Sequence, residues 1–221
     1  RPARKSSPRN ASRGSQMRIV ITGGPSVGKT TIVSLLAQRG FKIVHEFATE
    51  IIREGVYLPW VDRSSFQNEV LRRQLKAEQA LQGYDDLVFL DRGLFDGEAY
   101  YIYDKIEIPP VFAALDASQY SLAFLVEELP FFVKDEVRRE NLEFTRQISI
   151  ILEHCYASRN VEVVRVPAMS PEQRVDFVLE EIEMRRGLIA RKSKLHEHRR
   201  RAGQRLMPTT VPLHPAAVPA V

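Results

Sequence analysis

Cysteine is almost absent from this chain, and long apolar runs are missing. The single cysteine, Cys155, excludes an internal disulfide and favours a reducing compartment, so we expect a cytoplasmic protein. No stretch of about 18 apolar residues occurs, and the sequence therefore predicts no transmembrane segment. Disorder throughout is excluded because 44% of the 221 residues are hydrophobic, and this length fits one domain with tails.

Acidic residues are missing from the start of the chain and nearly missing from its end. Residues 1–16 carry five Arg or Lys and no acid, and residues 185–221 carry nine with one acid. Residues 17–184 hold 18 basic and 27 acidic side chains, so the net charge of +4 comes from the two ends. An acidic domain disfavours specific nucleic-acid binding, because such binders usually carry a basic face on the domain itself.

This charge distribution predicts one folded domain over residues 17–184 and two flexible tails. The N-terminal tail, residues 1–16, is interpreted as an extension ahead of a start at Met17 in preference to a transit peptide or a basic arm. The C-terminal tail, residues 185–221, is first basic and then Pro-rich. Its charges favour at most weak, salt-sensitive contact with a membrane surface.

Between the tails, short apolar runs alternate with helical patterns, which is typical of an α/β fold with a parallel sheet. Five strands are predicted, at residues 17–21, 41–44, 87–90, 121–126 and 161–166. Helices are predicted at residues 29–39, 64–82, 96–104, 135–158 and 171–186. The last helix has a clear start, because Ser170 can cap it, Pro171 suits the first helical position and Gln173 completes a capping box.

The strongest motif follows the first predicted strand and fits the pattern G-x-x-x-x-G-K-[ST]. Chance matches in a chain of this length occur on the order of one per cent of the time. Its backbone N–H groups can cradle phosphate, Lys29 can reach the β- and γ-phosphates, and the Thr30 hydroxyl can ligate Mg²⁺. The residues predicted to bind ATP are Gly23, Gly24, Pro25, Ser26, Val27, Gly28, Lys29, Thr30 and Thr31.

A second polar segment, Asp91-Arg92-Gly93, follows the apolar run LVFL. A carboxylate at the carboxyl end of a strand is where P-loop proteins place their second magnesium-facing group, so Thr30 and Asp91 are the predicted metal residues. The neighbouring Arg92 is suited to bidentate contact with phosphate. An exposed turn is the alternative interpretation of this segment. The presence of the P-loop favours the functional interpretation over the exposed turn.

Several segments together resemble a known family. ITGGPSVGKTT, HEFATEIIREG, FQNEVLRRQLKAE and VFLDRGLFDGEAYY are similar to the NadR-like P-loop kinase/ATPase domains, as are DEVRRENLEF and VVRVPAMSPEQRVDFVL. This family includes the ribosylnicotinamide kinase part of bacterial NAD-biosynthesis regulators and the ATPase-like domains of TRPL-translocation-defect proteins, and it is related to deoxynucleoside and thymidylate kinases. The resemblance covers about residues 17–180 and implies a three-layer P-loop NTPase fold with a five-stranded parallel sheet of nucleoside-kinase type. The P-loop strand would be central and the Asp91 strand beside it.

The resemblance also implies roles for residues outside the P-loop. Asp91 would orient Mg²⁺ through water or accept the proton of the substrate hydroxyl, and Arg92 would clamp phosphate. Glu46 matches an acid that related nucleoside kinases place near the acceptor hydroxyl. The family often shows E-x-A-R at this point, whereas this chain has Thr49 where the arginine is expected, with Arg53 one helical turn further on as a substitute.

Arg138 and Arg139, at the start of a long predicted helix, resemble the lid arginines of small-molecule kinases. Arg138 is the preferred candidate for stabilising the charge on the transferring phosphoryl group. An exposed basic pair is the alternative interpretation.

Other residues have structural interpretations that outweigh functional ones. Gln67 and Gln74 are expected on a solvated helix face in preference to facing a substrate base. Asp96 is expected to cap its helix, and Trp60 to pack under a loop in preference to shaping an acceptor pocket. His45 has no second histidine at the H-E-x-x-H spacing, so zinc is not indicated.

The sequence therefore predicts an ATP- and Mg²⁺-dependent kinase that phosphorylates a hydroxyl group of a small, nucleoside-like acceptor, with Lys29, Asp91, Arg92, Glu46 and Arg138 as its catalytic residues. The absence of an N/TKxD-type segment favours ATP over GTP. The alternative is a nucleotide-binding regulatory module that contacts a membrane or a partner through its basic tails, and Thr49 supports it. A nucleic-acid-binding protein is the least favoured class.

Overall fold

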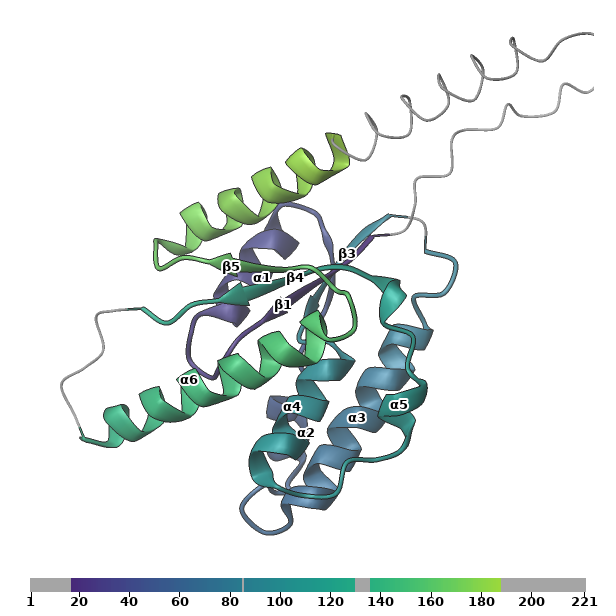
Figure 1. The fold of residues 1–221 in the computed structure, drawn as a ribbon, viewed down its shortest axis with the longest axis vertical. Coiled ribbons are helices and arrows are strands. Elements are labelled where there is room, and N and C mark those ends of the chain that lie inside the picture. Colours follow the sequence, from purple (N-terminus) through teal and green to yellow (C-terminus); the bar gives the residue numbers. More distant parts are fainter. Residues whose placement is uncertain (1–16, 85, 130–135, 188–221) are drawn as a thin grey trace, which may run out of the picture. The chain divides into compact units, whose positions relative to one another are not determined.

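The structure, a computed structural model, describes residues 17–84, 86–129 and 136–187, with side chains not described over 136–141. Five strands form one parallel sheet in the order β2-β3-β1-β4-β5 (Figure 1). They are β1 (Met17–Thr22), β2 (Lys42–Val44), β3 (Leu87–Asp91), β4 (Tyr120–Val126) and β5 (Val163–Val166). The predicted five-stranded parallel sheet is confirmed, with the P-loop strand at its centre and the Asp91 strand next to it.

The helices connect these strands in sequence order. They are α1 (Lys29–Gln38), α2 (Ala48–Glu54), α3 (Arg63–Gln79), α4 (Leu94–Asp104), α5 (Val111–Ala114), the 3₁₀ turn η1 (Ala117–Gln119) and α6 (Glu136–Ala157). Helices α2 and α5 were not predicted, because segments of seven and four residues are too short to show a helical period. Helix α4 starts before the predicted Asp96, since Gly93 already adopts the extended N-cap conformation.

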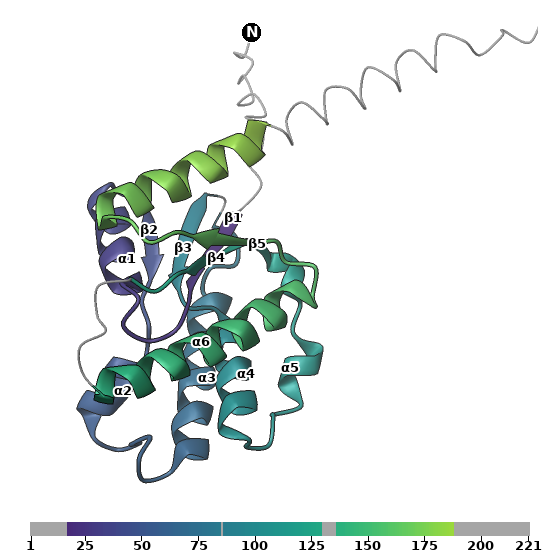
Figure 2. The same cartoon turned by 60° about the vertical axis from the view of Figure 1, so that its left-hand side comes forward.

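Both faces of the sheet are covered, which is why its central strands are almost wholly apolar. Every residue of β1 and β3 is buried. Helix α1 packs on one face against β1, β2 and β3, whereas α6 packs on the other face against β4 and β5 and also contacts α4 (Figure 2). This three-layer arrangement leaves the carboxyl ends of the strands free to carry loops, the usual place for a site in a parallel α/β sheet.

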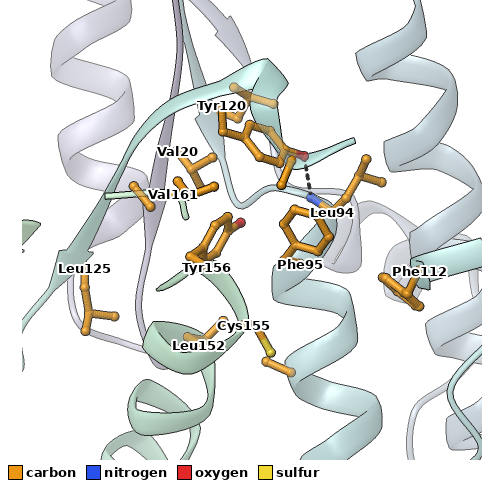
Figure 3. Close-up of a cluster of buried hydrophobic side chains, with 14 of the residues drawn as sticks. Val20, Leu94, Phe95, Phe112, Tyr120, Leu125, Leu152, Cys155, Tyr156 and Val161 are labelled. Carbon is orange, nitrogen blue, oxygen red and sulfur yellow. Dashed lines mark hydrogen bonds between the residues drawn. The ribbon is translucent and has the colours of Figure 1, made fainter. Parts of the chain in front are cut away.

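An aromatic cluster lies between the sheet and helices α4 and α6 (Figure 3). Phe95 makes edge-to-face contacts with Tyr120 and Tyr156, whose ring centroids lie 5.8 and 5.7 Å away. The Tyr120 hydroxyl accepts a hydrogen bond of 3.0 Å from the backbone N–H of Leu94, as the dashed line in Figure 3 shows. Cys155 is buried in the same cluster, as expected for a small apolar side chain, and burial raises the pKa of its thiol to about 12.

A helical segment follows β5 at residues 171–187. Its predicted capping box is confirmed: Ser170 Oγ accepts from the Gln173 N–H at 3.3 Å, and Gln173 Oε1 accepts from the Ser170 N–H at 3.1 Å. The chain divides into two compact units, residues 1–178 and 179–221, and all the strands and labelled helices belong to the first. Both predicted tails lie outside the described residues, except for 185–187.

Candidate functional site

The P-loop lies between the end of β1 and the start of α1, in the strand–loop–helix context that the motif requires. The loop turns through left-handed conformations at Ser26 (φ 60°) and Gly28 (φ 94°). Six of its nine predicted residues line one cavity: Pro25, Ser26, Gly28, Lys29, Thr30 and Thr31. The other three residues, Gly23, Gly24 and Val27, are buried, and Val27 belongs to the core at 2% exposure.

Gly24 illustrates why this loop needs a residue without a side chain. A Cβ atom at this position would lie 2.9 Å from the Cα and the carbonyl oxygen of Thr145 in α6. Neither backbone atom could move away cheaply, so α6 sets the position of the loop by direct backbone contact. The motif therefore fixes a packing contact as well as a phosphate cradle.

Lys29 is a buried cation whose ammonium points back into the loop. Its Nζ atom donates a hydrogen bond of 2.6 Å to the carbonyl oxygen of Gly24, and the residue is 5% exposed. Burial, together with the positive charge of Arg92, lowers the pKa of this ammonium from its ordinary range. A nearby anion such as phosphate would reverse this effect, because opposite charge favours the protonated form.

Asp91 ends β3 directly beside the P-loop. Its Oδ2 atom lies 3.4 Å from Thr30 Oγ1, and its buried Oδ1 atom has no hydrogen-bond partner among the described residues. Burial, reinforced by the negative charge of Glu46, raises the pKa of this carboxyl. A buried carboxylate oxygen without a partner is a costly feature, which a bound cation would offset.

These two residues fit a magnesium site. A hydroxyl and a carboxylate oxygen are ligands that Mg²⁺ prefers, and this ion usually keeps waters and binds substrate phosphates together with one or two protein groups. Within residues 17–84, 86–129 and 136–187, no cluster of three or more His, Cys, Asp or Glu could hold a metal by itself. Thr30 and Asp91 would therefore hold Mg²⁺ jointly with a nucleotide.

Arg92 connects the P-loop to the two neighbouring acids. Its Nε atom donates to Glu46 Oε1 at 2.8 Å, and its Nη1 atom donates to Asp96 Oδ1 at 3.1 Å and to the Gly23 carbonyl at 3.3 Å. The residue itself has a left-handed backbone (φ 73°), an uncommon conformation for a side chain of this size. This strain is a feature of functional positions, where the surrounding contacts hold the residue in place.

Asp96 fixes the start of α4 beneath this cluster. It accepts hydrogen bonds from the Gly93 N–H (3.0 Å), the Thr22 hydroxyl (2.6 Å) and the Tyr156 hydroxyl (2.6 Å). The expected helix-capping role is confirmed, from the third helical position, and Asp96 also lines the cavity. The carboxylate thus ties β1, α4 and α6 together directly below Arg92.

The cavity extends from the P-loop to helices α2, α3 and α4 and has a volume of about 590 Å³. Its far wall combines apolar side chains with two amides: Phe47, Ile52, Phe66, Val70, Leu71, Tyr100, Phe144, Gln67 and Gln74. The expectation that Gln67 and Gln74 face solvent is wrong, since they are 4% and 5% exposed. The α3 period alone does not show that α2 and α4 cover this face of the helix.

The two glutamines differ in their hydrogen bonds. Gln74 Nε2 donates to Glu78 Oε1 at 2.7 Å and to the Arg92 carbonyl at 3.2 Å. The side-chain amide of Gln67 makes no hydrogen bond to any described residue, although Gln67 is 4% exposed and lines the cavity. Gln67 therefore leaves an amide free to contact a ligand.

Of four other residues singled out from the sequence, two lie outside the cavity lining, and the side chains of two are not described. Arg53 is exposed and is not part of the cavity lining, whereas Thr49 and Arg63 are. The expectation that Trp60 packs under a loop is wrong, since Trp60 is 71% exposed, whereas its neighbour Pro59 lines the cavity. The backbone of Arg138 lies in the first turn of α6, and its side chain is outside the described part of the chain, as is that of Arg139.

Sequence reasoning missed one buried arginine next to the P-loop. Arg174, which is 2% exposed, donates three hydrogen bonds to backbone carbonyls, one of them in the P-loop. Its position in an ordinary amphipathic helix gives no signal of this contact. Only the folded chain brings residue 174 to residue 27.

The sheet order, the P-loop and the carboxylate at the end of the adjacent strand define the chain as a P-loop α/β protein with the fold of nucleoside and nucleotide kinases. Residues 18–174 match the sequence profile of a family described as an AAA domain (AAA_28). The chain belongs to this family, and the resemblance to NadR-like kinase domains is confirmed. No curated protein matches the chain in sequence.

Solved structures of kinases share this fold. Thymidylate kinase from Ehrlichia chaffeensis superposes with a TM-score of 0.55 at 14% identity, over 76% of this chain and 99% of its own. Deoxyadenosine kinase from M. mycoides, with the products dCMP and a flexible dCDP bound, gives 0.54 at 13%, over 76% and 100%. A NadR protein in complex with NR gives 0.59 at 17%, over 76% of this chain and 50% of its own, so the match spans half of that protein. At these identities the similarity establishes the fold.

No helix in the described part of the chain has the length and hydropathy needed to cross a bilayer.

Proposed function

We propose that the protein is an ATP- and Mg²⁺-dependent kinase that transfers the γ-phosphoryl group of ATP to a hydroxyl group of a small, nucleoside-like acceptor. One observation carries this proposal. One cavity is lined by the P-loop, by aromatic and amide side chains, and by Asp91, Arg92 and Glu46. A protein that only hydrolysed or sensed ATP would not need these additional aromatic and amide side chains next to the P-loop.

The dimensions and chemistry of the cavity suit a planar, partly polar acceptor. Its volume of about 590 Å³ lies within the range of small-molecule sites. Aromatic and aliphatic side chains would contact the two faces of a base, and the free amide of Gln67 would donate to and accept from its edge. The NadR structure contains NR, and the deoxyadenosine kinase structure contains dCMP and dCDP.

In this mechanism, phosphate binding changes the partner of Lys29. The ammonium would leave the Gly24 carbonyl, which it contacts at 2.6 Å, for the β- and γ-phosphates. The P-loop amides and the N-terminus of α1 would hold the phosphate oxygens. Mg²⁺, held by Thr30 and Asp91, would supply charge neutralisation at these phosphates.

The acceptor side would be organised by the Arg92 cluster. Arg92 keeps Glu46 at 2.8 Å, so the Glu46 carboxylate is held next to the place where an acceptor hydroxyl would approach. Glu46 or Asp91 would take the hydroxyl proton as the general base. Arg138 would stabilise the charge on the moving phosphoryl group from the start of α6.

The test is ATP consumption against a panel of nucleosides, deoxynucleosides and nicotinamide riboside. We expect at least one acceptor to raise consumption, and Lys29→Ala to abolish the increase. Lys42→Ala is the matched control, because Lys42 is exposed on β2 away from the cavity lining. The proposal is wrong if no acceptor raises consumption above the level of Lys29→Ala.

A nucleotide-binding regulatory module is the second candidate, and one observation favours it. Thr49 lines the cavity where the family often has an arginine, and Arg53 does not replace it there. Such a module would bind MgATP in calorimetry but show no acceptor-dependent turnover. Deleting residues 1–16 and 185–221 adds a second criterion, since a kinase keeps its turnover and an adhesion module loses its function.

A further inference from the structure

Arg174 makes an unusual set of contacts for a buried charge. Nη1 donates to the Val27 carbonyl at 2.7 Å, Nη2 to the Glu127 carbonyl at 2.8 Å and Nε to the Pro167 carbonyl at 3.1 Å. These three carbonyls belong to the P-loop, the segment after β4 and the segment after β5. Among the described residues, no carboxylate accepts a hydrogen bond from this guanidinium, so its donors serve the backbone alone.

The guanidinium lies directly behind the P-loop. A Cβ atom at Gly28 would be 3.5 Å from Arg174 Nη1. The capping box at Ser170 and Gln173 fixes the first turn of the helical segment, and the Arg174 N–H closes that turn by donating to the Ser170 carbonyl at 2.9 Å. Arg174 is therefore presented to the loop from a rigid element.

Peptide geometry converts this contact into an orientation of the loop. The C=O and N–H groups of one trans peptide point in opposite directions. Because the Val27 carbonyl faces Arg174, the N–H of Gly28 faces the other way, towards the cavity that Gly28, Lys29 and Thr30 line. An amide with that orientation is a donor to phosphate.

Side chains also contact two other loop carbonyls, at longer distances. The Pro25 carbonyl lies 3.4 Å from the Thr145 hydroxyl, and the Gly23 carbonyl accepts from Arg92 Nη1 at 3.3 Å. The Gly24 carbonyl instead accepts a hydrogen bond from Lys29. The next residue, Pro25, has no N–H, so the orientation of this peptide affects no phosphate donor. Of the three contacts from Arg92, Thr145 and Arg174 to loop carbonyls, the one from Arg174 is the shortest.

We infer that Arg174 is a positioning residue of the P-loop, which preorganises the Gly28 amide for phosphate by holding the Val27 carbonyl. This inference rests on the proposed binding of MgATP. It goes beyond that proposal because Arg174 itself would touch neither nucleotide nor acceptor. The Arg174 side chain would set the ATP affinity and leave the acceptor site unchanged.

The experiment compares Arg174→Lys and Arg174→Ala with the full-length wild type. Lysine keeps the charge but cannot reach three carbonyls in three directions, so we expect a loss of MgATP affinity of about tenfold or more in calorimetry, since a tenfold change corresponds to about 1.4 kcal/mol. With the best acceptor of the panel, KM for ATP should rise while KM for the acceptor stays within about twofold. The control is Arg39→Ala, which breaks an exposed pair with Asp176 (2.6 Å) in the same helical segment and should leave both constants unchanged.

The outcomes separate this inference from the proposed function. Wild-type binding of MgATP together with unchanged affinity in folded Arg174→Lys overturns the inference alone, and absence of wild-type binding overturns both. Equal increases in both KM values would show a merely structural role and also overturn it. Should neither variant fold, the Gly28 amide of the wild type decides by NMR: we expect its resonance to shift on MgATP addition, and no shift contradicts the inference.

Discussion

The cavity has two ends that are built differently. We call the end at the P-loop the phosphate end and the end lined by α2, α3 and α4 the acceptor end. At the phosphate end, side chains from three other elements hold the loop: Arg92 contacts Gly23, Thr145 contacts Pro25 and Arg174 contacts Val27. At the acceptor end, the side-chain amide of Gln67 has no hydrogen-bond partner among the described residues. For the proposed kinase, this difference means that the phosphate site would be preorganised in the free protein, whereas the acceptor site would keep polar groups free for the ligand.

A substitution at the junction of the two ends should have the largest effect. We expect Asp91→Asn to lower kcat by about 10²–10⁴-fold, the range for loss of a positioned acid–base group. The same variant should not be less stable at pH 8, because burial and Glu46 penalise the Asp91 charge and asparagine has none. Acceptor-dependent turnover and thermal unfolding at pH 5 and pH 8 measure the two effects.

The matched control for this variant is Asp86→Asn, at the opposite end of the same strand. Asp86 accepts a hydrogen bond of 2.7 Å from the Leu87 N–H, and asparagine retains an acceptor there. Unchanged turnover in Asp91→Asn, or a lower unfolding temperature at pH 8, would show that Asp91 is an ordinary paired carboxylate. Asp91 would then have no special role at the junction of the two ends.

The phosphate end could be predicted from the sequence because its residues are local. Gly23 to Thr31 are contiguous, and Asp91 and Arg92 end an adjacent strand, so a motif and a strand pattern identify them. The family resemblance also implied the central place of the P-loop strand with the Asp91 strand beside it, which the sheet order confirms. Arg174 could not be predicted, since its role depends on three carbonyls distant in sequence.

The acceptor end was predicted less well because its burial is a tertiary property. Gln67 and Gln74 occupy positions that the helical period assigns to a polar face, and α2, which helps to cover them, is too short to show a period. For Trp60 the error is the opposite one, because burial was predicted and the residue is exposed. Large aromatic residues are usually packed, but here the neighbouring Pro59 lines the cavity instead.

The wall behind the acceptor end contains a second buried acid, which contrasts with Asp91 because it is fully hydrogen-bonded. Glu78 accepts from Gln74 Nε2 and the Tyr120 hydroxyl, both at 2.7 Å, and Arg18 lies 3.9 Å away. Burial nevertheless raises the pKa of Glu78 from 4.5 to about 6. A raised folded-state pKa stabilises the fold below pH 4.5, and this contribution is lost as the pH rises through about 6.

Glu78→Gln tests this contribution at the acceptor wall. At about 1.36 kcal/mol per pKa unit, the wild type should lose about 2 kcal/mol of unfolding free energy across that window through Glu78. The variant should lack this loss, which urea denaturation at pH 4.5 and pH 7 measures. Parallel pH profiles for the two proteins would contradict the prediction. Glu153→Gln is the control, since Glu153 is exposed in an ion pair with Arg165.

Gln67 tests whether the acceptor end reads its ligand by hydrogen bonding. We expect Gln67→Leu to raise KM for the acceptor about tenfold, the value of about one lost hydrogen bond, and to leave MgATP affinity unchanged. Gln79→Leu is the matched control on the exposed end of α3. Equal effects on ATP and acceptor would mean that the two ends are not independent.

The smallest effect is expected in the loop between α2 and α3, where three side chains are more than 70% exposed: Val56, Trp60 and Val61. Because Trp60 buries little surface, Trp60→Ser should change the unfolding free energy by at most about 0.5 kcal/mol, whereas Phe66→Ala, at 5% exposure in the cavity wall, should cost about 3–5 kcal/mol. Urea denaturation measures both.

Trp60 is the single tryptophan of the chain, so its fluorescence also reports on this loop. Since Pro59 lines the cavity beside it, acceptor binding should shift the emission and MgATP alone should not; the reverse pattern would place the responsive end of the site at the phosphates.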